Sequence, residues 1–101
     1  MARYADTSGL TPQEAELWER IIAHQGETFR TARGLPFTYR VAGNEVFFSR
    51  KEKSVTLSGF IRAYRSAVAL GGTVPGPKTL NVFGASYIYP LFLALGVISP
   101  P

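Results

Sequence analysis

Cysteine is absent from the 101-residue sequence, and histidine occurs once, as His24. The absence of cysteine excludes a disulfide framework and every metal site that uses thiolate ligands. One histidine cannot supply a metal site that needs several histidines from the same chain. Ser86, as a candidate nucleophile, has no acid, histidine or cysteine near it in the sequence to activate it. We therefore predict no metal, no cofactor and no enzymatic activity.

Acidic side chains are scarce after residue 28. Residues 1–28 hold two basic and five acidic side chains, a net charge of −3, whereas residues 29–101 hold nine basic and two acidic ones, a net charge of +7. A basic body is expected where a protein contacts a polyanion, although small domains are also often basic for solubility. DNA or RNA is therefore the first partner class to consider.

Charge of either sign is missing from residues 79–101. Asn81, Gly84 and Ser86 interrupt this segment, and its continuous apolar part, residues 87–98, is too short to cross a bilayer. The N-terminus lacks the apolar stretch of a secretory signal, so we predict a cytoplasmic protein without membrane contact. If the segment holds more apolar surface than a small core buries, the surplus forms a homodimer or another protein interface. That is the alternative function.

A capping box marks the start of the first predicted helix. Thr11 lies three residues before Glu14, with proline at the first helical position, so each side chain can bond the other residue's backbone amide. Apolar residues at helical spacing follow, and Gly26 supplies a left-handed exit. This pattern predicts a helix over residues 12–25, after a flexible arm over residues 1–10.

After this helix, the helical spacing of apolar residues gives way to an alternation of apolar and polar side chains. Residues 27–31 and 54–56 predict short strands, and residues 37–49 predict a hairpin that turns at Gly43-Asn44. The predicted cross-strand pairs are Val41 with Val46, Tyr39 with Phe48 and Arg40 with Phe47. The core face of this hairpin then holds Phe37, Tyr39, Val41, Val46 and Phe48, and the outer face holds Thr38, Arg40, Ala42, Phe47 and Ser49.

Helical spacing returns after residue 56. It predicts a helix over residues 57–70 and a last helix over residues 85–95, with Pro90 in or near the first turn. The apolar stripe of the first of these is Leu57, Ile61, Tyr64 and Val68, reinforced by Phe60. The order α-β-β-β-α-α predicts a single α+β domain over residues 11–101, in which a small three-stranded antiparallel sheet packs with three helices.

Several blocks of the sequence resemble a family of short bacterial proteins of unknown function. The blocks are GETF from residue 26, GLPFTYRVAGNEVF from residue 34, SRKEKS from residue 49, GPK from residue 76 and FGASYIYP from residue 83. The resemblance covers residues 26–98 and implies a bacterial, intracellular, self-contained domain. It carries over no catalytic or binding residue.

The outer face of the hairpin is the first candidate site. It places Arg40 opposite Phe47, and Arg30 of the first strand is a further cation. Sheets that bind nucleic acid use arginines for phosphates or base edges and rings for stacking. The alternative is that a helix covers this face and makes Phe47 part of the core, which apolar residues on both faces of a sheet favour.

A basic cluster is the second candidate, formed by Arg50, Lys51 and Lys53 in a turn and by Arg62 and Arg65 in the next helix. The two helical arginines lie three residues apart and are therefore neighbours on one face. Flexible lysines and forked arginines of this kind neutralise phosphates, although charge runs are as often ordinary solvated surface. The sequence thus predicts a non-enzymatic accessory domain that binds DNA or RNA.

Two glycine segments, Gly76-Pro77-Lys78 and Gly84-Ala85-Ser86, are the weakest candidate. A glycine before a helix can present backbone amides to an anion, with Lys78 assisting. Neither segment has the glycine spacing of a phosphate-binding loop or a dinucleotide fingerprint. They predict a turn and a helix cap.

Overall fold

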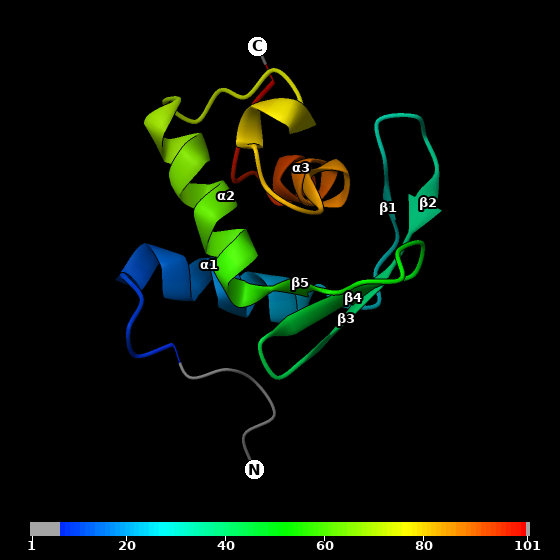
Figure 1. The fold of residues 1–101 in the computed structure, drawn as a ribbon, viewed down its shortest axis with the longest axis horizontal. Helices are drawn as coiled ribbons and strands as arrows, with labels where there is room; N and C mark the ends of the chain where they lie inside the picture. Colours follow the sequence, from blue (N-terminus) through cyan, green and yellow to red (C-terminus); the bar gives the residue numbers. More distant parts are fainter. Residues whose placement is uncertain (1–6, 101) are drawn as a thin grey trace.

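Within the described residues, three α-helices combine with two small antiparallel sheets, which confirms the predicted α+β class. The computed structural model describes residues 7–100. Leu10, at the end of the predicted arm, packs against the core, whereas residues 1–6 of that arm lie outside the described residues. The elements in chain order (Figure 1) are α1 (Pro12–Ala23), β1 (Phe29–Arg30), β2 (Pro36–Phe37), β3 (Tyr39–Ala42), β4 (Glu45–Phe48), β5 (Val55–Thr56), α2 (Leu57–Ala69), the 3₁₀ helix η1 (Pro77–Leu80) and α3 (Ala85–Ala94).

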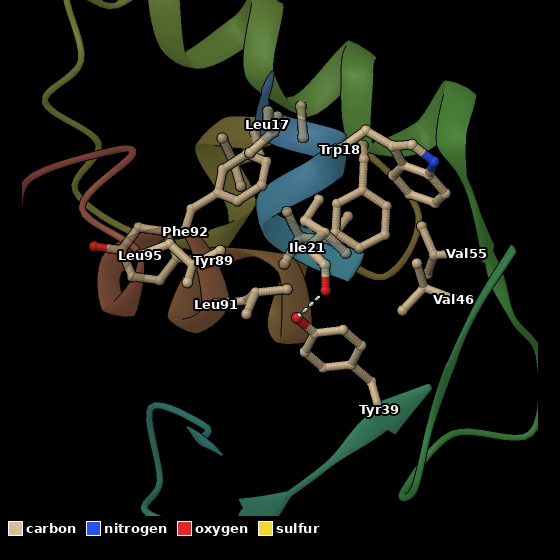
Figure 2. Close-up of a cluster of buried hydrophobic side chains, with 14 of the residues drawn as sticks. Leu17, Trp18, Ile21, Tyr39, Val46, Val55, Tyr89, Leu91, Phe92 and Leu95 are labelled. Carbon is tan, nitrogen blue, oxygen red and sulfur yellow. Dashed lines mark hydrogen bonds between the residues drawn. The ribbon is translucent and has the colours of Figure 1, made fainter. Parts of the chain in front are cut away.

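The larger sheet is antiparallel, with its strands in the order β3-β4-β5. The β3–β4 hairpin has the predicted register, in which Arg40 lies opposite Phe47 and Tyr39 lies opposite Phe48. The predicted core face is buried, as the alternation of side chains requires. The hydroxyl of Tyr39 donates to the carbonyl of Ile21 at 2.6 Å, and burial raises the pKa of this phenol (Figure 2).

The first predicted strand does not join that sheet. It is shortened to β1, which pairs with β2 in a separate two-stranded sheet, with Phe29 opposite Phe37. The chain reverses directly after β1, where the amide of Thr31 donates to the carbonyl of Leu35 at 2.9 Å. The local turn therefore supplies a partner strand before the next hairpin begins. The resulting β1–β2 hairpin lies beside α3 (Figure 1).

Helix α1 begins with the predicted capping box. The amide of Glu14 donates to the Thr11 hydroxyl at 3.2 Å, and the amide of Thr11 donates to the Glu14 carboxylate at 3.1 Å. The helix ends at Ala23, two residues earlier than predicted. Its buried side chains Leu17, Trp18 and Ile21 meet residues of the sheet and of α3 in the core (Figure 2).

The buried face of α2 follows the predicted stripe in part. Leu57, Phe60 and Ile61 are buried as predicted. Val68 is 58% exposed and Tyr64 is only half-buried, whereas Ala63 and Ala67 are buried. The small alanines allow close packing at this helix face, so the larger Val68 is left on the solvent side. The ring of Phe60 lies between those of Trp18 and Phe92, with centroids 6.2 Å from each.

Helix α3 lies at the centre of the molecule, with α2 on one side and the β1–β2 hairpin on the other (Figure 1). Its residues Ile88–Phe92 are buried. Pro90 lies at the sixth position of this ten-residue helix rather than in the first turn as predicted. The carbonyl four residues earlier, that of Ser86, therefore lacks its usual helical donor. None of the helices within residues 7–100 has the length and apolar character needed to cross a bilayer.

Candidate functional site

A groove of about 700 Å³ lies between α2, η1 and the start of α3. Two of its side chains are basic, Arg62 from α2 and Lys78 from η1, and both are exposed. Within residues 7–100, neither one takes part in an ion pair or a side-chain hydrogen bond, so both charges are available to a ligand. We call this the Phe83 groove; its lining residues are Arg62, Pro77, Lys78, Asn81, Val82, Phe83, Ala85 and Ser86.

The aromatic ring of Phe83 forms one edge of this groove. It is 57% exposed, which is unusual for a large apolar side chain in a segment whose other rings are buried or half-buried. The ammonium of Lys51 lies 3.8 Å from the centroid of the ring, in a cation–π contact. Lys51 comes from the segment between β4 and β5, so this contact adds a third cation at the edge of the groove.

Gly84 brings Phe83 close to the sheet. Its backbone is left-handed, with φ of 79°, a conformation that favours glycine. A Cβ atom at this position would lie 2.5 Å from Cγ2 of Val55 and 3.7 Å from Cε of Lys51. Only glycine therefore allows the start of α3 to approach β5 this closely, and this approach places the ring beneath Lys51.

The first turn of α3 contributes further polar groups to the groove. Ala85 and Ser86 line it, and the N-cap residue Gly84 supplies no side-chain hydrogen bond to the helix. The positive end of the helix dipole adds to the positive potential of Arg62 and Lys78. The two glycine segments of the sequence analysis, interpreted there as a turn and a cap, thus meet in one groove.

The predicted basic cluster is divided in the structure. Lys51 and Arg62 lie at the Phe83 groove, and Lys53 is exposed in the turn before β5. Arg50 is exposed, but its Nε donates to the carbonyl of Pro36 at 2.5 Å, which fixes the side chain against β2. These residues are close in sequence, but Arg50 is held by a backbone carbonyl while Lys51 contacts a ring.

Arg65 forms an ion pair with Glu14 of α1. Its Nε lies 2.8 Å from the carboxylate of Glu14, which is only 4% exposed. The hydrogen bond from this guanidinium, with the amide of Thr11, holds the pKa of the Glu14 carboxyl below its usual value. The same bond raises the pKa of Arg65. Arg65 therefore joins α2 to α1, and its charge is largely neutralised within the protein.

The outer face of the larger sheet is open. Arg40 is exposed, and its Cζ lies 4.3 Å from the centroid of the Phe47 ring, which is half-buried and outside the core. The alternative, that a helix covers this face and makes Phe47 part of the core, is wrong, because the helices pack against the opposite face, where Val46 and Phe48 are buried. Arg40 and Phe47 thus form a second surface that combines a cation and a ring.

Arg30 does not join Arg40, contrary to the prediction. It lies in β1, which belongs to the other sheet, and its guanidinium donates to the carbonyl of Gly34 at 2.9 Å. Arg30 also lines a groove together with residues of α3, among them Tyr89 and Pro90. The separate pairing of β1 with β2 explains this displacement.

The contacts of the tyrosines near the groove and of the titratable side chains in the described part of the chain bear on a catalytic or metal-binding arrangement. No three His, Cys, Asp or Glu side chains gather there as a metal site. The hydroxyls of Tyr87 and Tyr89 donate to the carbonyls of Arg50 and Val74, at 3.2 and 2.8 Å. Both phenols therefore connect segments of the fold.

The comparisons with protein-family models, curated proteins and solved structures give no match to this chain. The resemblance of residues 26–98 to a family of short bacterial proteins therefore stays an expectation from the sequence. The function is inferred below from the side chains of the groove.

Proposed function

We propose that this protein is a non-enzymatic nucleic-acid-binding domain and that its ligand binds in the Phe83 groove. The observation that carries this proposal is the placement of Arg62 and Lys78, which form no ion pair with any residue of the described range 7–100, beside an exposed ring that Lys51 contacts. Three cations at one groove suit the phosphates of a nucleic-acid backbone. The net charge of +7 on residues 29–101 attracts a polyanion to the molecule.

The alternative function, a protein interface built from residues 79–101, has weaker support. It was motivated by a surplus of apolar surface in this segment. Within the described part of the segment, Ile88–Phe92, Leu95 and Ile98 are buried, and Phe83 is the only large apolar side chain that is classed as exposed. Most of the apolar surface of this segment is buried in the core and is not available for an interface. Nucleic-acid binding is therefore the function that we favour.

A pair of triple variants tests the proposal. In the first, Lys51→Gln, Arg62→Gln and Lys78→Gln remove the three cations of the groove. In the matched control, Arg33→Gln, Arg40→Gln and Lys53→Gln remove the same charge from exposed residues elsewhere. Affinity for labelled oligonucleotides is measured by fluorescence anisotropy over a series of salt concentrations.

We expect the groove triple to bind weakly and to lose about 2 units from the slope of log K against log salt, since each contacted phosphate contributes about 0.7 on a single strand. The control variant should keep most of the slope of log K against log salt. Equal losses of affinity and slope in the two triple variants contradict a localised site. Absence of binding by the wild-type protein at low salt contradicts the function itself.

A further inference from the structure

Phosphate binding alone does not explain why the ring of Phe83 is exposed. Its ring is 57% exposed at the edge of a groove whose cations already suit a phosphate backbone. A duplex keeps its bases stacked internally, so a protein that contacts only duplex phosphates gains nothing from an exposed ring. Proteins that bind single strands instead combine a basic groove with aromatic side chains on which bases stack.

From this we infer that the ligand is a single-stranded nucleic acid, with an unpaired base stacked on the face of the Phe83 ring that Lys51 does not cover and its adjoining phosphates on Lys51, Arg62 and Lys78. This inference rests on the proposed function and narrows it. The ring comes from the η1–α3 connection, while the cations come from three other places: the β4–β5 segment, α2 and η1. One cation thus contacts the ring and the other two line the same groove, each from a separate element.

The position of the ring is set by the backbone rather than by packing in the core. The close approach of Gly84 to Val55 fixes the chain directly after Phe83. The core cluster of buried residues is complete without this ring, and Val82 and Ala85 on either side of it are half-buried. Phe83 therefore lies outside the core next to a closely packed glycine, which reduces the ordering that a stacked base must impose on the protein.

The groove also offers hydrogen-bonding groups beside the ring. Asn81 and Ser86 are exposed in it, within the same short segment as the ring. Stacking tolerates any base, so these two side chains are the ones that can contact a base edge. Single-stranded DNA and RNA share the phosphates and bases that this arrangement fits, and the experiment separates the two.

The test compares wild type, Phe83→Leu and Phe83→Trp on three labelled ligands: oligothymidine, oligouridine and a mixed-sequence DNA duplex. Phe83→Leu keeps an apolar side chain and removes the ring, and Phe83→Trp keeps an aromatic surface. Because Phe83 is exposed, both variants should melt close to wild type. Phe47→Leu, which removes the half-buried ring of the outer sheet face, is the control.

We expect wild type to bind at least one single strand more tightly than the duplex. Phe83→Leu should weaken that binding about 5- to 100-fold with an unchanged salt slope, Phe83→Trp should retain it, and Phe47→Leu should leave it unchanged. The better of the thymidine and uridine ligands identifies DNA or RNA. Equal affinity for single strand and duplex, or no effect of Phe83→Leu on single-strand binding, overturns this inference. The proposed function is tested separately, by the triple variant that removes the three cations of the groove. A loss with Phe47→Leu instead places the stacking ring on the sheet.

Discussion

Arg65 and Glu14 form a two-bonded ion pair that joins α2 to α1. The Nε of Arg65 lies 2.8 Å from one carboxylate oxygen of Glu14, and its Nη2 lies 3.3 Å from the other. The same carboxylate accepts the amide of Thr11 in the capping box. One buried acid therefore completes the start of a helix and fixes the contact between two helices, while it removes Arg65 from the set of cations available to a ligand.

The lowered pKa of Glu14 predicts a pH-dependent stability. Because the folded carboxyl has a lower pKa than the unfolded one, its contribution is fully present above the unfolded value, near 4.5, and is lost as pH falls through the folded value. Glu14→Gln should be less stable than wild type at neutral pH, and the difference should shrink below pH 4.5. Denaturant melts at neutral and acidic pH measure this.

Glutamine at this position is the informative replacement because it can still complete a capping box. Glu19→Gln, at an exposed position of the same helix, is the control and should show no comparable pH dependence. A constant difference between wild type and Glu14→Gln across the pH range contradicts the role of the charge.

A second prediction concerns Gly84. Gly84→Ala should destabilise the protein by more than the roughly 1 kcal/mol that a strained backbone costs, because its Cβ would also lie 2.5 Å from Cγ2 of Val55. Gly71→Ala is the matched control, since Gly71 has nearly the same φ, 78°, with nothing within 4 Å of its Cβ position. Thermal or urea unfolding measures both. Equal losses in the two variants would mean that the contact with Val55 relaxes freely.

A third prediction compares the two neighbouring rings Phe47 and Phe48, which lie on opposite faces of β4. Phe48 is buried, so Phe48→Ala should cost about 3–5 kcal/mol of stability. Phe47 is half-buried and contacts Arg40, so Phe47→Ala should cost only about 1 kcal/mol. Urea melts of the two variants measure the difference. A loss for Phe47→Ala as large as that for Phe48→Ala contradicts an open outer face.

Local signals predicted those parts of the fold that depend on local physics. The capping box at Thr11, the left-handed glycine at residue 26 and the register of Val41 with Val46 all follow from the chemistry of a few adjacent residues. The α+β class followed from the order of these elements. The resemblance to a bacterial family contributed no residue to the site.

The errors arose where a contact joins distant residues or where competing partners lie close. The predicted stripe of α2 was wrong only in its C-terminal half, because helix periodicity does not say which of two adjacent faces packs. Ala63 and Ala67 are buried there in place of Val68. The basic cluster was divided because Glu14, distant in sequence, pairs with Arg65. Phe83 was missed as a site residue because its segment is apolar; the glycine that follows it was the available signal.

The most direct test of the account is a map of the ligand on the protein by NMR. Uniformly ¹⁵N-labelled protein is titrated with oligothymidine and with oligouridine at low salt, and the shifts of the assigned backbone amides are followed. We predict that the largest shifts fall in residues 78–88, around Lys51 and around Arg62, and that the amides of Arg40 and Phe47 change little. Shifts centred on Arg40 and Phe47, or no shifts with either strand, would contradict the Phe83 groove as the binding site.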